Sequence, residues 1–252
     1  MTPEYSFYLF AIPAVLIAGM SKGGLGGAIG MLTTPLVALA TDPLRAAAIM
    51  LPVLIVMDAI SLYSWRRHVR WSVLRSVLPG AFVGLALGWA TAATVPEAAI
   101  RALVGAIAVV FALNQIFADW RQREAKPENL ARASAWGLVA GYTSFVSHAG
   151  GPPFQAYVLP LKMDKLLFAG TSAVFFAVVN LAKVVPYIAL GQFKTDNLLL
   201  SAKLVPLAIF GVLLGVWMVR RVSQQLFYRI TYAAMLIIGV KLIWDGAGAL
   251  LR

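Results

Sequence analysis

The stretch Gly19-Met-Ser-Lys-Gly-Gly-Leu-Gly-Gly-Ala-Ile-Gly30 places one lysine and six glycines between two short apolar segments. A continuous helix is disfavoured here, because each glycine costs up to about 1 kcal/mol relative to alanine. Backbone amides that leave a helix find no partner in lipid, so such a break is stable only against protein or water. We expect a helix to restart near Gly24, with its free amides and positive dipole end facing Lys22. The stretch therefore predicts an anion site between membrane helices. A plain cytoplasmic turn, with Lys22 as a topology signal, is the alternative.

The composition indicates that lipid surrounds most of the chain. Its 252 residues are 61% hydrophobic and 12% charged, with a mean hydropathy of +0.83. The net charge of +11 comes from basic residues between the apolar runs, a placement typical of membrane topology and not of a nucleic-acid surface. The absence of cysteine excludes disulfide scaffolds and thiolate metal sites. The amino terminus carries Glu4 and lacks a basic region, so no cleaved signal peptide is expected.

Ten apolar segments form two sets of five. They run approximately over 5–20, 24–40, 44–65, 73–95 and 98–118, and then over 133–147, 151–161, 165–189, 196–219 and 226–250. The polar stretch 119–132 separates the sets and is expected to be a cytoplasmic loop. We therefore predict a single transmembrane domain, 1–252, made of two repeats at about 1–118 and 133–252.

Matching residues support the duplication. Asp58 and Asn180 lie at equivalent positions of the third segment in each half. A proline and two glycines also reappear 127 positions later, Pro79, Gly84 and Gly88 returning as Pro206, Gly211 and Gly215. Small residues at four-residue spacing are typical of closely packed membrane helices, and we expect these glycines to serve packing.

The distribution of basic residues predicts that the repeats are inverted. If every apolar segment reverses the chain, fourteen Lys and Arg residues lie on one side of the membrane, and only Arg45, Arg101, Lys194 and Arg252 lie on the other. Such a bias agrees with the positive-inside rule and places both termini in the periplasm. The expected fold is an all-α polytopic membrane protein with two inverted-topology repeats, broken helical hairpins and about 8–10 membrane segments. Charge counting does not distinguish a full crossing from a re-entrant hairpin.

A second break matches the first. Thr143-Ser-Phe-Val-Ser-His-Ala-Gly-Gly-Pro-Pro-Phe-Gln155 interrupts the second half with glycine, proline and hydroxyl groups. Paired interruptions in a duplicated membrane protein indicate a binding site at the repeat interface. The residues expected to bind the solute are Ser21, Lys22, Gly23, Gly24, Gly26, Gly27, Thr33, Thr34, Asp58, Ser147, His148, Gly150, Gly151, Gln155, Asn180 and Lys183.

Several of these residues have a second interpretation. His148 is expected to carry a proton or donate to the anion, or else to be an ordinary hydrogen-bonded histidine. Asp58 and Asn180 are expected to face inward. Lys183 either provides a second positive contact or extends to the interface.

The glycine-rich segment Ser21 to Pro35, its degenerate copy around Ser147 to Pro153 and the duplicated length resemble the TauE/SafE family of sulfite and organosulfonate exporters. The resemblance implies a bacterial inner-membrane permease that exports a small anion such as sulfite or sulfoacetate by alternating access. The residues alone leave open the direction of transport, coupling to a proton or another ion, and a homodimeric state.

Competing functions remain. A cation or metal permease would need several acidic or histidine ligands, and the segments offer chiefly Asp58 and His148. A non-transporting membrane scaffold is a second alternative. An enzyme is disfavoured because hydrolase and metalloprotease motifs are absent, and we expect neither a cofactor nor a nucleic-acid partner.

Overall fold

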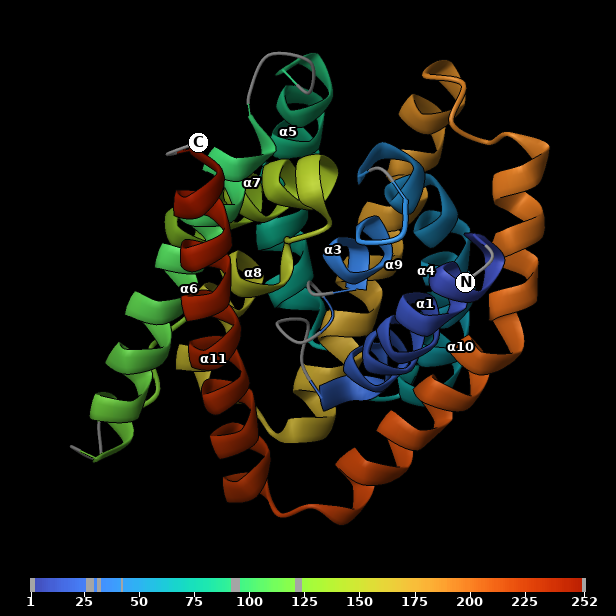
Figure 1. Ribbon diagram of the computed structural model, residues 1–252. Coiled ribbons are helices and arrows are strands. Elements are labelled where there is room, and N and C mark those ends of the chain that lie inside the picture. The colour runs from blue at the N-terminus through green and yellow to red at the C-terminus, as the bar shows by residue number, and fades with distance from the viewer. Residues whose placement is uncertain are drawn as a thin grey trace.

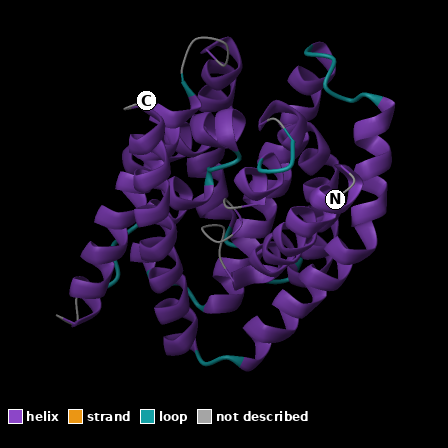
Figure 2. Ribbon diagram, viewed as in Figure 1, coloured by secondary structure: helices purple, strands orange, loops and turns teal. Residues whose placement is uncertain are grey.

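The computed structural model describes residues 3–25, 30, 33–41, 43–91, 96–120 and 124–250, and within these ranges the chain is helical, with connecting loops and no strand (Figure 2). The first half comprises α1 (Pro3–Met20), the π-helical turn η1 (Ser21–Leu25), α3 (Thr33–Ala38), α4 (Pro43–Trp65), α5 (Trp71–Thr91) and α6 (Glu97–Trp120). The second half comprises α7 (Leu130–Ser147), α8 (Gly151–Val158), the 3-10 turn η2 (Leu159–Leu161), α9 (Lys165–Ala189), α10 (Thr195–Arg221) and α11 (Gln224–Leu250). The predicted all-α fold class is confirmed.

The two halves have the same order of elements. Each begins with a helix that ends at a break, followed by a short helix and then three long helices. The connection between the halves is shorter than the predicted loop 119–132, because α6 extends to Trp120 and α7 begins at Leu130. The side chain of Asn129 starts α7 by accepting a hydrogen bond of 2.9 Å from the Arg132 amide.

Glycines allow each half to pack closely against the other. In the contact between α5 and α7, a Cβ added at Gly84 would lie 1.9 Å from Leu138 O. In the contact between α10 and α1, a Cβ added at Gly215 would lie 2.4 Å from Met20 O. The repeated motif therefore joins the long helix of each half to the broken helix of the other, and the predicted packing role of these glycines is confirmed.

Two pairs of equivalent helices contact each other in antiparallel orientation. In the pair α4 and α9, a Cβ at Gly170 would lie 3.0 Å from Trp65 O, near the end of α4. Asn180 lies later in α9 and donates a hydrogen bond to Asp58, which lies earlier in α4. The helices α6 and α11 lie side by side (Figure 1). Their contacts also run in opposite order, Gly105 against Gly239 and Ala98 against Gly246. Equivalent helices of opposite direction are what an inverted repeat requires.

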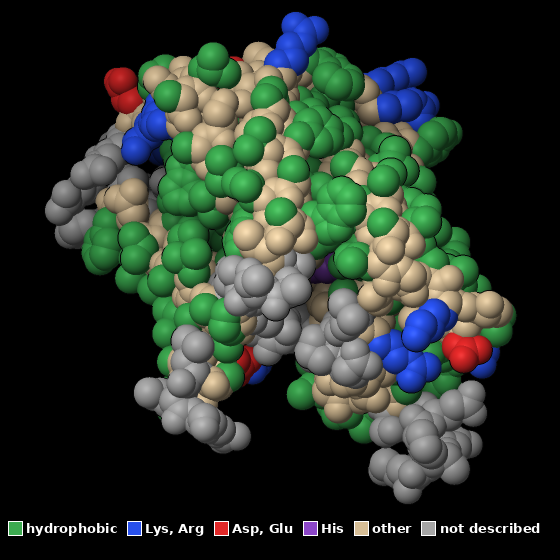
Figure 3. Space-filling view, turned by 90° about the horizontal axis from the view of Figure 1, so that it is seen from above, with side chains coloured by type: hydrophobic (Ala, Val, Ile, Leu, Met, Phe, Trp, Pro, Cys, Tyr) green, Lys and Arg blue, Asp and Glu red, His purple; other side chains and the backbone are tan. Residues whose placement is uncertain are grey.

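The outer surface is suited to lipid. Six helical stretches in the described part of the chain are long and apolar enough to cross a membrane: 7–25, 45–65, 71–91, 165–189, 195–221 and 224–249. Figure 3 shows hydrophobic side chains over most of the visible face, with Lys and Arg confined to a few places. Trp244 on α11 is 80% exposed, as expected for a side chain that contacts acyl chains or headgroups. The chain is a multi-pass membrane protein.

Candidate functional site

The first break is a kink at the end of α1. Gly24 has φ of 122°, a backbone conformation that suits glycine. Two carbonyls at the kink accept hydrogen bonds from side chains of α4. Ser61 Oγ donates to Lys22 O at 2.8 Å, and Trp65 Nε1 donates to Gly23 O at 3.0 Å. Side chains of α4 therefore satisfy backbone groups that lipid could not.

The predicted restart of a helix near Gly24 falls mostly outside the described residues. Helical turns continue through Leu25, and the next helix whose bounds are described, α3, begins at Thr33. The predicted site residues Gly26 and Gly27 lie outside the described residues.

The second break separates α7 from α8. His148 caps α7 in the left-handed conformation, with φ of 54°, and its amide donates to Ser144 O at 3.2 Å. Lys183 Nζ on α9 donates to the same carbonyl at 3.0 Å and to Ser144 Oγ at 3.1 Å. The chain then turns into α8 at Gly151. Here, too, a long helix supplies a donor to the broken one.

These two contacts are equivalent in the repeats, with the residue types exchanged. Ser61 donates to Lys22 O across 39 positions, and Lys183 donates to Ser144 O across 39 positions. Adding 122 to the residue numbers of the first pair gives those of the second pair, and 122 is also the separation of Asp58 and Asn180. The lysine therefore lies at the break in the first half and on the long helix in the second half.

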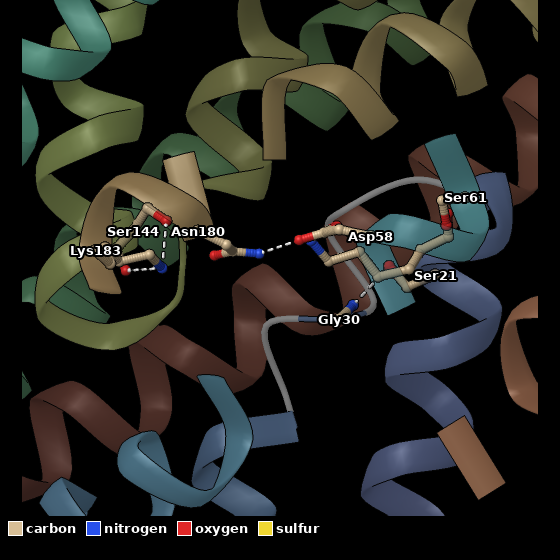
Figure 4. A network of polar contacts seen from close by, with 8 residues as sticks. Ser21, Gly30, Asp58, Ser61, Ser144, Asn180 and Lys183 are labelled. Carbon is tan, nitrogen blue, oxygen red and sulfur yellow. Dashed lines mark hydrogen bonds and ion pairs between the residues drawn. The ribbon is translucent and has the colours of Figure 1, made fainter. Parts of the chain in front are cut away.

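Asp58 connects the two halves. Its Oδ1 accepts from Lys22 Nζ at 2.5 Å, and its Oδ2 accepts from Asn180 Nδ2 at 2.6 Å. Figure 4 shows Asn180 and Asp58 facing each other, with Lys183 and Ser144 on the far side of Asn180. Both carboxylate oxygens thus have a partner, and each partner comes from a different half.

A cavity lies between the two breaks. The volume open to the centres of water-sized molecules is about 50 Å³, several times the roughly 10–15 Å³ that one water needs. Its walls come from both halves: Ala18, Ser21, Lys22, Gly24, Gly30, Thr33, Thr34, Leu54, Ser144, His148, Gly151, Ala169, Ser172, Ala173, Phe176, Asn180 and Lys183. A cavity of this size, with two lysines and several hydroxyl groups in an otherwise apolar lining, suits a small polar solute.

Several polar atoms of the cavity wall have no partner within the described part of the chain. They are Thr33 Oγ1, Ser172 Oγ and both ring nitrogens of His148, and all are buried. Buried polar atoms in folded proteins are nearly always hydrogen-bonded, so a cluster of exceptions around one cavity indicates groups that bind a ligand or water.

The charged groups at the cavity are more positive than negative. Two lysines line it, Lys22 and Lys183, whereas Asp58 supplies the one carboxylate that contacts them in the described residues. Lys22 Nζ also lies 4.8 Å from the centre of the Phe176 ring, a cation–π contact. Counted with both lysines and Asp58 ionised and His148 neutral, these groups have a formal net charge of +1.

The structure brings together most of the residues predicted from the sequence. Those that line the cavity are Ser21, Lys22, Gly24, Thr33, Thr34, His148, Gly151, Asn180 and Lys183, with Asp58 bonded directly to two of them.

Four further predicted residues do not line the cavity. A Cβ at Gly23 would meet Val212 O on α10, and one at Gly150 would meet Ala140 O on α7, so both glycines serve helix packing. The remaining two are Ser147, whose Oγ donates to Thr143 O at 3.3 Å, and Gln155, which is buried within α8.

Ser144, Ser172 and Phe176 also line the cavity and were not predicted, although the sequence carries a signal for each of them. Ser144 is the repeat equivalent of Lys22. On α9, the cavity residues recur every three or four positions, as one face of a helix requires: Ala169, Ser172, Ala173, Phe176, Asn180 and Lys183. Extending that face backwards from Asn180 would have identified two of the missing residues.

Comparison with known proteins gives a family match. Residues 11–242 match the family described as sulfite exporter TauE/SafE, which is nearly the whole chain. No curated protein and no solved structure matches. The described residues contain no group of three or more His, Cys, Asp or Glu side chains placed to hold a metal ion.

Proposed function

This chain belongs to the TauE/SafE family of sulfite-exporter-type membrane transporters, and from that premise we propose that it moves a small anion through the cavity between the two breaks. One observation supports the anion assignment above the others: two lysines, one from each half, line a cavity whose walls also contain unpartnered hydroxyl and imidazole groups. Anions need this combination of positive charge and hydrogen-bond donors.

The family suggests sulfite or an organosulfonate such as sulfoacetate as the solute. A sulfonate group presents three acceptor oxygens, which correspond in kind to the donors of Lys183, Ser172, Thr33 and His148. The cavity volume favours solutes of a few heavy atoms. We expect the protein in a bacterial inner membrane, with export as the direction of transport.

Alternating access is the mechanism that the architecture favours. The site lies between two halves whose equivalent helices run in opposite directions, so a movement that opens one face has a counterpart that opens the other. The close glycine contacts of α5 with α7 and of α1 with α10 make each broken helix part of the opposite half's rigid packing.

Counterflow in proteoliposomes tests the proposal. Purified protein is reconstituted in vesicles loaded with one unlabelled solute, and uptake of the same solute in labelled form is followed, for sulfite, sulfoacetate and a divalent cation in turn. We expect uptake of at least one of the anions, loss of it in Lys22→Ala, and retention in Lys194→Ala, which alters an exposed lysine away from the cavity. Uptake of the cation alone would overturn the anion assignment.

A further inference from the structure

We propose that Asp58 sets the valence of the transported anion, so that the site accepts monovalent anions and rejects divalent ones of similar shape. The inference rests on the proposed anion transport and adds the property by which the cavity chooses among anions. It narrows the solutes to monovalent forms such as hydrogensulfite and excludes sulfoacetate, whose sulfonate and carboxylate together carry two charges at neutral pH. It is carried by the charges and contacts of three side chains, Lys22, Asp58 and Lys183.

Lys22 already has a negative partner. Its ammonium lies 2.5 Å from Asp58 Oδ1, and the two side chains are only 12% and 3% exposed. At this distance and degree of burial the two charges largely cancel for any ligand in the cavity. Lys22 therefore offers hydrogen-bond donors to a ligand but little net charge.

Asp58 is held in that position by its second oxygen. Asn180 Nδ2 donates to Oδ2 at 2.6 Å, so the carboxylate is fixed between a cation and an amide. Asn180 and Lys183 lie one helical turn apart on α9, and both line the cavity. The Asp58 carboxylate is thus a fixed negative charge of the protein, held by two residues of the cavity wall as a bound anion would be.

Among the residues that the structure describes, Lys183 has no such partner. It is completely buried, and its Nζ donates to two oxygens of Ser144, a carbonyl and a hydroxyl, neither of which carries a full charge. An ammonium has three N–H groups, so one donor remains for the cavity that Lys183 lines. A buried ammonium without a counter-ion is costly, and an anion in the cavity would remove that cost.

The sum of these charges sets the preference. Two lysines and one aspartate give a net charge of +1 when His148 is neutral, and a monovalent anion brings the total to zero. A divalent anion would leave an uncompensated negative charge in a site of low dielectric constant. Replacing Asp58 by asparagine raises the net charge to +2 and should reverse the preference.

Competition between two sulfur oxyanions of fixed valence tests this. Methanesulfonate is monovalent and sulfate divalent throughout the neutral pH range, and they are similar in size. Each is added as a competitor in the counterflow assay, and the ratio of their inhibition constants is compared among variants. Wild-type protein should prefer methanesulfonate, and Asp58→Asn should shift the ratio toward sulfate by at least about tenfold, equivalent to about 1.4 kcal/mol.

Two double variants separate charge from structure. Asp58→Asn with Asn180→Asp moves the carboxylate to the equivalent residue of the other half and restores a net charge of +1. Lys22→Met with Asp58→Asn removes the ion pair and gives the same net charge. Both should regain the preference for methanesulfonate, read for these variants from the rise in melting temperature that each anion gives, a measurement that does not require transport. If Asp58→Asn alone does not fold, the Lys22→Met single variant, with a net charge of zero, should bind both anions more weakly than the double variant.

The outcomes distinguish the two proposals. If the wild-type protein transports anions but the ratio of the two inhibition constants is the same in all the variants, the role proposed for Asp58 is wrong. Anion transport would still stand. A wild-type preference for sulfate would also overturn the role proposed for Asp58. If no anion competes at all, the proposed function fails first.

Discussion

Asn180 Nδ2 donates a 2.6 Å hydrogen bond to Asp58 Oδ2, so two residues at equivalent positions of the repeats contact each other directly. In an inverted repeat, a side chain reaches its own counterpart only near the axis that would relate the two halves. The cavity lies beside this contact, which explains why both halves contribute to its walls. The same contact fixes the carboxylate beside Lys22 and so determines the charge of the site.

The ion pair of Lys22 and Asp58 should contribute to folding as well as to transport. Lys22→Met leaves a buried carboxylate without its cation, and we expect a loss of about 3–5 kcal/mol, seen as a lower melting temperature in detergent. The double variant Lys22→Met with Asp58→Asn removes both charges and should recover most of that stability. Equal losses in the single and double variants would show that the pair is not the cause.

His148 distinguishes a ligand-binding group from a structural one. Neither of its ring nitrogens has a partner among the described residues, so His148→Phe should leave the melting temperature of the empty protein unchanged or raise it. The same variant should weaken the stabilisation that added anion gives to the wild-type protein. A large loss of stability without ligand would instead indicate a structural hydrogen bond of the imidazole.

The contact between α5 and α7 should tolerate no side chain at Gly84. A Cβ there would lie 1.9 Å from Leu138 O, and Gly84→Ala should destabilise the protein by about 1–3 kcal/mol through displacement of the backbone. Gly248→Ala is the matched control, because a Cβ at that helical position meets nothing within 4 Å. Since alanine favours helix over glycine, the control should be neutral or stabilising, as measured by thermal unfolding.

The inverted orientation can be tested by labelling, since the native chain has no cysteine. Arg67→Cys, between α4 and α5, and Lys194→Cys, between α9 and α10, are both exposed. A membrane-impermeant maleimide should label Lys194→Cys from the periplasmic side of intact cells and Arg67→Cys only in inverted vesicles. Labelling of both from one side would contradict the topology predicted from the charges.

The fold was largely predictable because hydropathy, glycine spacing and duplication are local properties of the sequence. The segments predicted around 165–189 and 196–219 correspond closely to α9 and α10. The ends of helices were less predictable, as at Leu130, where the side chain of the preceding asparagine starts α7 earlier than the apolar pattern does.

The site was predictable only in part, because a break in a helix shows where backbone groups are freed but not where side chains point. Gly23 and Gly24 are adjacent in the sequence, yet Gly23 packs on α10 and Gly24 lines the cavity. The partner of Lys22 also depended on tertiary contacts, since Asp58 lies 36 positions away. The separation of 122 residues predicts that lysine and serine exchange places between the halves. That both residues take part in equivalent hydrogen bonds is seen only from the contacts of Ser61 and Lys183.

That exchange has a consequence for the transport cycle. If two inverted halves of a carrier were identical, its inward-open and outward-open forms would be related by a two-fold rotation and would have equal free energy. Here the lysine is carried by the broken helix in one half and by the long helix in the other, so swapping the conformations of the halves does not regenerate the same arrangement. In an alternating-access carrier, the empty protein would then rest preferentially open to one compartment before any gradient acts on it.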